Sequence, residues 1–213
     1  MIISKINSLR SVFLCSVLLF FISNVYADNP LKVMLYGDSL MAGYGLPQNE
    51  NLASELARNF EENDPSLIFI NASISGNTSK NGLSRVDWSL GDKPHIVVLC
   101  LGANDMLRGL DPSLTESNLD RIITQFKKSN TIVILAGMLS SVSMGPDYQA
   151  KFDSIYPKLS KKHGLIFMPF LLDGVALEKD LLLDDYKHPN AKGIEVIATN
   201  LSPYIVQAAS RLK

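Results

Sequence analysis

Short, unbroken runs of apolar residues alternate along the chain with longer segments whose apolar residues recur at helical spacing. The short runs are rich in Val, Ile, Leu and Phe and too brief for helices, so we predict five strands, at 32–36, 67–71, 96–101, 131–136 and 165–169. The longer segments predict helices at 51–63, 114–129 and 147–163, and a closing helix at 189–211. Pro189 suits the first turn of that last helix, whereas Pro203 in its interior predicts a kink or a break.

Strands that are apolar throughout are typical of a parallel sheet, because helices cover both of its faces. The sequence therefore predicts an α/β protein, a three-layer α/β/α sandwich around a central parallel sheet of about five strands. We expect residues 28–213 to form a single domain, because that length is ordinary for one domain and can bury a genuine core.

The beginning of the chain differs in character from the rest. A positively charged start precedes an apolar run at 12–22, and Val-Tyr-Ala at 25–27 fits the small-x-small pattern before a signal peptidase cut. We therefore expect residues 1–27 to be a signal peptide cleaved after Ala27, and the protein to be periplasmic or secreted. An uncleaved membrane anchor is the alternative, but the run is shorter than the ~18 to 20 residues that span a bilayer.

Charge and cysteine content narrow the partners and the means of stabilisation. The formal net charge of the chain is -1, and nothing in it attracts nucleic acid, so we expect no nucleic-acid partner. Of the two cysteines only Cys100 lies beyond the proposed signal, so an internal disulfide is not expected and packing must stabilise the fold. Cys100 lies within an apolar run and fits a small, buried side chain.

Polar and glycine-rich clusters follow three of the predicted strands. They are Gly-Asp-Ser at 37–39, Ser-Ile-Ser-Gly-Asn at 73–77 and Gly-Ala-Asn-Asp at 102–105. In an open parallel sheet, ligands bind beyond the carboxyl ends of the strands, so these clusters should meet at one rim. Ser39 is there a candidate nucleophile, although a tight strand-to-helix turn would also explain the glycines around it.

A serine nucleophile needs a base, and the chain has three histidines. His95 precedes the third strand at the opposite end of the sheet, where we expect it to satisfy a backbone carbonyl or face solvent. His163 ends a helix, where a positive charge suits the helix dipole. His188 lies in a loop with Asp185 three residues upstream, so the carboxylate could hold one ring nitrogen and leave the other for a hydroxyl. A solvated acidic turn that caps a helix explains the same residues equally well.

Four ordered blocks resemble those of the GDSL, or SGNH, hydrolase family. They are "GDSLMAGYG" at 37–45, "NASISGNTS" at 71–79, "GANDMLRG" at 102–109 and "DDYKHPN" at 184–190. The segment 144–159 resembles more narrowly the secreted bacterial arylesterase, acyl-CoA thioesterase I and lysophospholipase L1 group. The resemblance covers nearly all of the chain beyond the proposed signal, and it implies the flavodoxin-like SGNH hydrolase fold.

The resemblance also implies roles for individual residues. Ser39 is implied as the nucleophile, His188 as the general base and then acid, and Asp185 as the group that orients the imidazole. The backbone N–H groups of Ser39 and Gly76 and the side-chain amide of Asn104 are implied as the oxyanion hole. These residue types suit the task, since glycine leaves its backbone N–H open to approach and an amide donates without adding a charge.

Other polar residues near these motifs are expected to serve the structure. We expect Asp38 to fix the turn through backbone hydrogen bonds, and Asp184 is a rival acid that the D-x-x-H spacing disfavours. Asp105 should pair with local backbone or with Arg108. Trp88, the lone tryptophan, should pack in the core or along a helix.

The activity implied by the resemblance is that of a serine esterase or thioesterase, which cleaves small-molecule acyl or aryl substrates through an acyl-enzyme and needs neither metal nor organic cofactor. A carbohydrate deacetylase of the same family is the alternative, followed by a non-catalytic periplasmic binding protein. The acyl preference stays open, because Asn77 stands where the group usually has an aspartate and the loop 140–148 is less proline-rich than its counterpart. A monomer is favoured, with transient contact with lipid.

Overall fold

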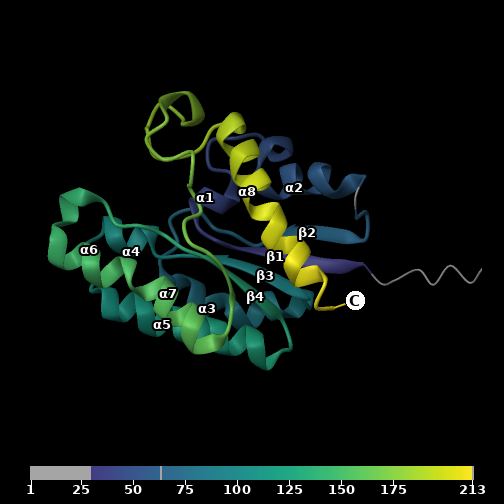
Figure 1. Ribbon diagram of the computed structural model, residues 1–213, viewed down its shortest axis with the longest axis horizontal. Helices are drawn as coiled ribbons and strands as arrows, with labels where there is room; N and C mark the ends of the chain where they lie inside the picture. Colours follow the sequence, from purple (N-terminus) through teal and green to yellow (C-terminus); the bar gives the residue numbers. More distant parts are fainter. Residues whose placement is uncertain (1–29, 63, 213) are drawn as a thin grey trace, which may run out of the picture.

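A five-stranded sheet lies at the centre of the computed structural model, which describes residues 30–62 and 64–212 (Figure 1). Its strands are β1 (Leu31–Gly37), β2 (Leu67–Asn71), β3 (Ile96–Cys100), β4 (Ile132–Ala136) and β5 (Ile166–Met168). Neighbouring strands are parallel, in the order β2-β1-β3-β4-β5. The predicted strands and the parallel sheet are confirmed. The strand order reverses between β1 and β3, and α/β sheets bind ligands at such a point.

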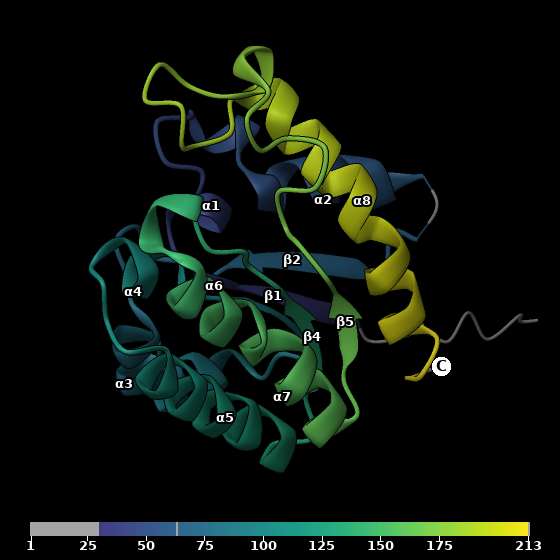
Figure 2. The ribbon, with the colours of Figure 1, turned by 60° about the vertical axis from the view of Figure 1, so that its left-hand side comes forward.

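Helices cover both faces of the sheet, as Figures 1 and 2 show. On one face lie α2 (Leu52–Glu61) and α8 (Ala191–Ala209), and on the other α3 (Ser79–Ser89), α5 (Pro112–Lys128) and α7 (Ile155–His163). The short helices are α1 (Ser39–Ala42), α4 (Ala103–Leu107) and α6 (Pro146–Asp153), and the 3-10 turns are η1 (Gln48–Glu50), η2 (Leu90–Asp92), η3 (Val142–Met144) and η4 (Lys179–Leu181). The three-layer sandwich is therefore confirmed.

The buried strands give the carboxyl rim of the sheet a rigid base. Every residue of β3 is buried, including the free thiol of Cys100, and β1 is buried from Val33 to Gly37. The ring of Tyr36 meets Phe126 edge-on, with 5.2 Å between ring centroids, and its hydroxyl donates to the Gly82 carbonyl at 2.5 Å. Burial of each large apolar side chain contributes roughly 1.5–3 kcal/mol, so β1 and β3 end at fixed positions from which the rim loops begin.

The helix α3 does not follow from the apolar pattern, which predicts no helix between β2 and β3. Its buried positions are mainly small or polar, namely Ser79, Gly82, Val86 and Ser89. A Cβ at Gly82 would lie 2.3 Å from the Leu101 side chain, so the helix packs closely on the sheet through its small residues. The start is fixed by Thr78, whose side chain accepts from the Asn81 N–H in a reciprocal capping box.

The predicted boundaries near the end of the chain need two corrections. The helix expected at 147–163 is two helices, α6 and α7, which meet at Ser154. The closing helix begins later than predicted, because Asn190 is its N-cap and Pro189 lies before it. Of the kink or break predicted at Pro203, the break is absent: α8 runs through the proline, and Leu201 and Ile205 on either side of it are fully buried.

No helix within 30–62 and 64–212 is both long enough and apolar enough to cross a bilayer. The proposed signal peptide at 1–27 lies outside the described residues. The expectation about cleavage after Ala27 therefore stays a prediction.

Candidate active site

The first cluster turns the chain sharply from β1 into α1, with Ser39 as the first helical residue. Asp38 is the N-cap, and its Oδ1 accepts from the Leu40 N–H at 3.1 Å, as predicted for the residue that fixes this turn. Gly37 is required by close packing, since a Cβ there would lie 2.7 Å from the carbonyl oxygen of Cys100. The tight turn and the partly exposed Ser39 are therefore one arrangement and not alternatives.

The loop before α8 arches over the end of the sheet near α1 (Figure 1) and brings His188 to Ser39. The Nε2 atom of His188 lies 2.9 Å from Ser39 Oγ, although 149 positions separate the two residues. The Nδ1 atom lies 2.5 Å from Asp185 Oδ2. Because an ionised carboxylate can only accept, the Nδ1 atom carries the proton and Nε2 is free to accept from the serine hydroxyl.

Asp185 is held by the backbone of its own turn. Its Oδ1 accepts from the N–H groups of Lys187 at 2.9 Å and His188 at 3.0 Å. The bond from the His188 ring and these backbone bonds lower the pKa of Asp185 to about 2. Asp184 is exposed, and of these two acids only Asp185 makes a hydrogen bond with the imidazole.

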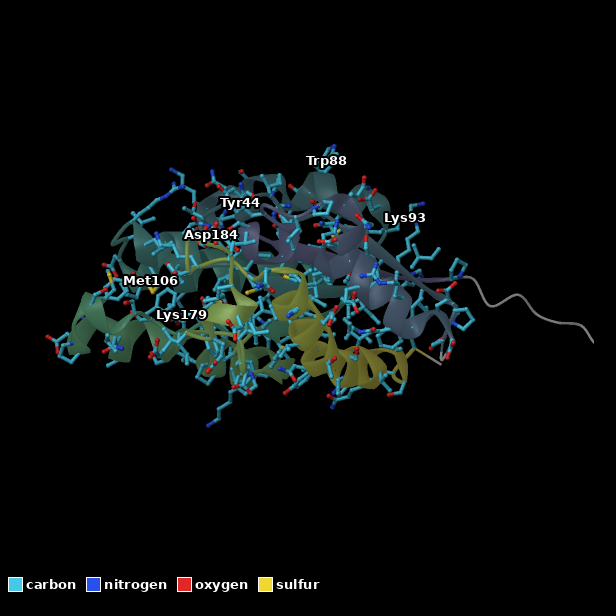
Figure 3. All side chains as sticks on the ribbon, turned by 90° about the horizontal axis from the view of Figure 1, so that it is seen from above. Tyr44, Trp88, Lys93, Met106, Lys179 and Asp184 are labelled. Carbon is cyan, nitrogen blue, oxygen red and sulfur yellow. The ribbon has the colours of Figure 1, made fainter. Side chains whose placement is uncertain are left out.

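An aromatic ring that the sequence does not single out completes the setting of the histidine. Tyr44 lies against His188 with ring centroids 4.4 Å apart and planes inclined by 34°. Next to it, Gly45 has a φ of +76°, and a Cβ there would lie 2.7 Å from a methyl carbon of Leu183 in the histidine loop. In Figure 3 Tyr44 and Asp184 are seen at the same end of the molecule. An aromatic residue between two glycines of the first block was the only available signal for this contact.

Two of the three expected oxyanion donors are free. Within the described residues, the backbone N–H groups of Ser39 and Gly76 donate to no acceptor. The third, the Asn104 amide, donates to the Asn77 carbonyl at 3.1 Å. Gly76 has a φ of +79°, a conformation that residues with a Cβ rarely adopt, and open space around its Cα.

The Asn104 amide also lies near Asp38, the buried acid beside Ser39. Asp38 is 1% exposed, and its Oδ2 has no hydrogen-bond partner among the described residues. Burial raises the pKa of Asp38 to about 6, against the opposing effects of the Leu40 N–H, the charge of His188 and the Asn104 amide. The hydrogen bond from Ile74 N to the Gly37 carbonyl, at 3.1 Å, joins the second cluster to the first.

Two expectations about neighbouring residues are wrong. Asp105 does not pair with Arg108; it is buried and accepts from the Ser79 N–H at 2.7 Å and the Ser79 hydroxyl at 2.6 Å. Arg108 instead donates to the Gly76 carbonyl at 2.9 Å. Trp88 is 76% exposed and projects outward in Figure 3, because the close-packed small residues of α3 occupy the opposite side of that helix.

The other two histidines make their contacts away from Ser39. His95 precedes β3 as predicted and is partly exposed to solvent, and its Nδ1 accepts from the Lys32 N–H at 3.0 Å. His163 ends α7 as predicted and lies 2.6 Å from an oxygen of Asp120. Among the residues that the structure describes, no group of three or more His, Cys, Asp or Glu side chains could hold a metal ion.

Comparison with known proteins gives a consistent set of relatives. The model of the "GDSL-like Lipase/Acylhydrolase family" matches residues 35–196. An arylesterase of Vibrio mimicus is 34% identical over 195 residues, which cover 91% of this chain and 98% of that protein. The thioesterase 1/protease 1/lysophospholipase L1 of Escherichia coli K12 is 35% identical over 167 residues, covering 78% of this chain and 79% of that protein.

Solved structures agree with the sequence matches. The psychrotrophic esterase EstA from Pseudoalteromonas, inhibited by monoethylphosphonate, superposes with a TM-score of 0.80 at 31% identity, covering 86% of this chain and all of that one. A structure of TesA gives a TM-score of 0.79 at 29% identity, covering 83% of this chain and 99% of that one.

Proposed function

Because the chain belongs to the GDSL-like lipase/acylhydrolase family and is an ester or thioester hydrolase, we propose that Ser39, His188 and Asp185 are its catalytic triad. The observation that carries this proposal is the continuous chain of contacts from Asp185 Oδ2 through the imidazole to Ser39 Oγ, at 2.5 and 2.9 Å. This order of groups lets the serine hydroxyl lose its proton as it attacks.

The reaction proceeds through an acyl-enzyme. His188 Nε2 takes the Ser39 proton while Oγ bonds to the carbonyl carbon, and Asp185 stabilises the imidazolium that forms. The imidazolium then protonates the leaving alcohol or thiol as its bond to carbon breaks. A water molecule, deprotonated by the same nitrogen, attacks the acyl-serine and forms a second tetrahedral intermediate. Its bond to Ser39 Oγ then breaks, which releases the carboxylic acid, and the imidazolium returns the proton to Oγ.

The developing negative charge on the carbonyl oxygen is received by the backbone N–H groups of Ser39 and Gly76 and by the Asn104 amide. Both backbone donors are free among the described residues, whereas Asn104 would exchange the Asn77 carbonyl for the substrate oxygen. Donors of this kind are each worth about 10²- to 10³-fold in kcat, because they bind the transition state better than the ground state.

Apolar side chains around the rim favour an acyl or aryl substrate over a sugar. Large hydrophobic residues are exposed on the segments that follow four different strands, all at the carboxyl edge: Tyr44, Ile74, Leu107, Leu139 and Val142. Exposed apolar surface of this kind at a rim is typical of ligand binding. The named relatives act on aryl esters, thioesters or lysophospholipids according to their names, and we propose the same classes for this chain.

The test is a p-nitrophenyl ester series of increasing acyl length, run beside an acyl-CoA, a lysophospholipid and an acetylated sugar. We expect turnover to peak on an ester or thioester with an apolar acyl group, and Ser39→Ala to lower kcat by roughly 10⁴-fold or more while the protein stays folded. Peak activity on the acetylated sugar would replace the substrate class with the deacetylase alternative. Undiminished turnover by Ser39→Ala would refute the triad.

We also propose that residues 1–27 direct the chain to the periplasm or the medium, that the catalytic domain is a monomer, and that it contacts lipid transiently. Amino-terminal sequencing tests the export proposal, and the exported protein should begin after Ala27. Light scattering tests the monomer proposal, and it should give the mass of one chain. Vesicle sedimentation should leave most of the enzyme unbound. A chain retained intact in the inner membrane would favour the anchor instead.

A further inference from the structure

Arg85 of α3 contacts two segments beside Ser39: the turn at the end of β1 and the loop that follows β2. Its Nε donates to the Asn77 side-chain oxygen at 2.8 Å and its Nη1 to the Ala72 carbonyl at 2.6 Å, both in the segment that carries Gly76. Its Nη2 donates to the Gly37 carbonyl at 3.1 Å, at the end of β1. One guanidinium therefore joins the segment bearing an oxyanion donor to the turn that holds Ser39.

The guanidinium is itself fixed from the other side. Its central carbon lies 3.9 Å from the centroid of the buried Tyr36 ring, whose hydroxyl is bonded to Gly82 of the same helix. Burial lowers the pKa of Arg85, and no carboxylate forms an ion pair with it among residues 30–62 and 64–212. The cation is held by carbonyl dipoles, an amide and a ring face, a set that fits a planar fork and not the point charge of a lysine.

The segment that Arg85 holds also determines where the third donor points. The carbonyl of Asn77 accepts from the Asn104 amide at 3.1 Å, so a shift of Asn77 would move Asn104 as well as Gly76. Arg108 holds the Gly76 carbonyl from the solvent side. Arg85 touches neither the nucleophile nor the free N–H groups, and its effect must therefore act through the backbone that it binds.

We propose that Arg85 is a positioning residue of the oxyanion hole, which holds the Gly76–Asn77 segment in register with Ser39. This inference rests on the proposed function of Ser39, Gly76 and Asn104. Donors must lie within hydrogen-bond distance of the place that the oxyanion will occupy, and small displacements cost large factors in rate. Because the donors act mainly on the transition state, their displacement lowers kcat and leaves KM nearly unchanged.

The experiment compares Arg85→Lys, Arg85→Met and Asn77→Ala with Arg121→Lys, a matched change at an exposed arginine of α5. For each variant, kcat and KM are measured on one p-nitrophenyl ester, together with the inhibition constant of an alkyl boronic acid, whose tetrahedral adduct with a serine places an oxygen in the hole. Active-site titration and thermal unfolding correct for any misfolded fraction.

We expect Arg85→Lys to lower kcat by about 10- to 100-fold and Arg85→Met by more, with KM changed by less than about threefold. Asn77→Ala, which removes one of the three bonds, should lower kcat by about 3- to 10-fold. The boronic acid should lose affinity in step with kcat. Arg121→Lys should match the wild type in kcat, KM, inhibition constant and thermal unfolding.

Two outcomes would overturn the inference. One is a kcat within about twofold of the wild type for Arg85→Lys and Asn77→Ala; the other is a fall in kcat without any loss of boronic acid affinity. If Arg85→Met does not fold, the other two variants still decide. An inactive Ser39→Ala alongside a fully active Arg85→Lys would leave the triad standing and remove only the role of Arg85, whereas an active Ser39→Ala would remove the proposed function itself.

Discussion

The ring of Tyr44 lies on the imidazole of His188, 4.4 Å between centroids, and so fixes the plane in which the histidine faces Ser39. Asp185 fixes the same ring from its edge through Nδ1. His188, the proposed base, is therefore held by contacts in two directions, one from its own loop and one from the turn that follows Ser39.

Removal of the Tyr44 ring should loosen the base without removing any reacting group. An aromatic pair of this kind is worth about 0.5–1.5 kcal/mol, so Tyr44→Ala should lower kcat about 2- to 10-fold. Tyr44→Phe keeps the ring and serves as the control, and should stay within about twofold of the wild type. Steady-state kinetics on a p-nitrophenyl ester measure both. Equal losses in the two variants would show that the hydroxyl, and not the ring, matters.

The Asn104 amide should matter only in the transition state. We expect Asn104→Ala to lower kcat by about 10²- to 10³-fold with little change in KM, because the ground-state carbonyl gains little from the hole. Asn200→Ala removes an amide of the same size from α8, where it donates to the Asp173 carbonyl at 3.0 Å, and it should leave the kinetics unchanged. A loss at Asn104 confined to KM would place this side chain in substrate binding instead.

Asp105 should contribute to stability and not to chemistry. Its carboxylate receives two bonds from Ser79 and one from the Thr115 hydroxyl at 3.3 Å, so Asp105→Ala leaves several buried donors without an acceptor. The expected loss is about 2–3 kcal/mol of unfolding free energy. Urea denaturation measures it, with Asp87→Ala, an exposed acid of α3, as the control. A variant as stable as Asp87→Ala would contradict this role.

Features of the structure could be predicted from the sequence where the interaction was local or where the apolar pattern determined it. The strands were predictable because buried β-strands are continuous apolar runs, and the Asp185–His188 contact because both residues lie in one turn. Asp105 was misassigned because its partner Ser79 lies 26 positions away in a polar segment. Arg85 was not singled out at all for a similar reason, since its contact with Gly37 spans 48 positions.

The helix α3 shows a second reason for failure. Its buried side is made largely of serine and glycine, since the helix packs too closely on the sheet for larger side chains. Apolar periodicity cannot detect such a helix. Trp88 misleads as well, because this large apolar residue suggests a packed position but lies on the exposed face of the helix. Close packing by small residues is set by the neighbouring elements and not by the segment itself.

Asp38 should make the stability of the protein fall as the pH rises through the weakly acidic range. Its pKa is raised from 3.8 to about 6 by burial, so between these values the folded protein binds a proton that the unfolded chain has released. The stabilisation from the protonated carboxyl is complete below about pH 4 and is lost as the pH rises through about 6. The shift corresponds to roughly 3 kcal/mol as an order of magnitude.

Asp38→Asn tests this directly, because asparagine keeps an oxygen that can cap α1 at the Leu40 N–H but does not titrate. Other acids, such as Asp185 with its lowered pKa, change stability in the opposite sense at lower pH, and they cancel in the difference between the two proteins. Unfolding free energies from urea denaturation at pH 4.5, 5.5, 6.5 and 7.5 should therefore favour the variant increasingly up to about pH 6.5 and then level off. A difference between variant and wild type that does not change over this range would show that Asp38 is ionised in the folded protein throughout.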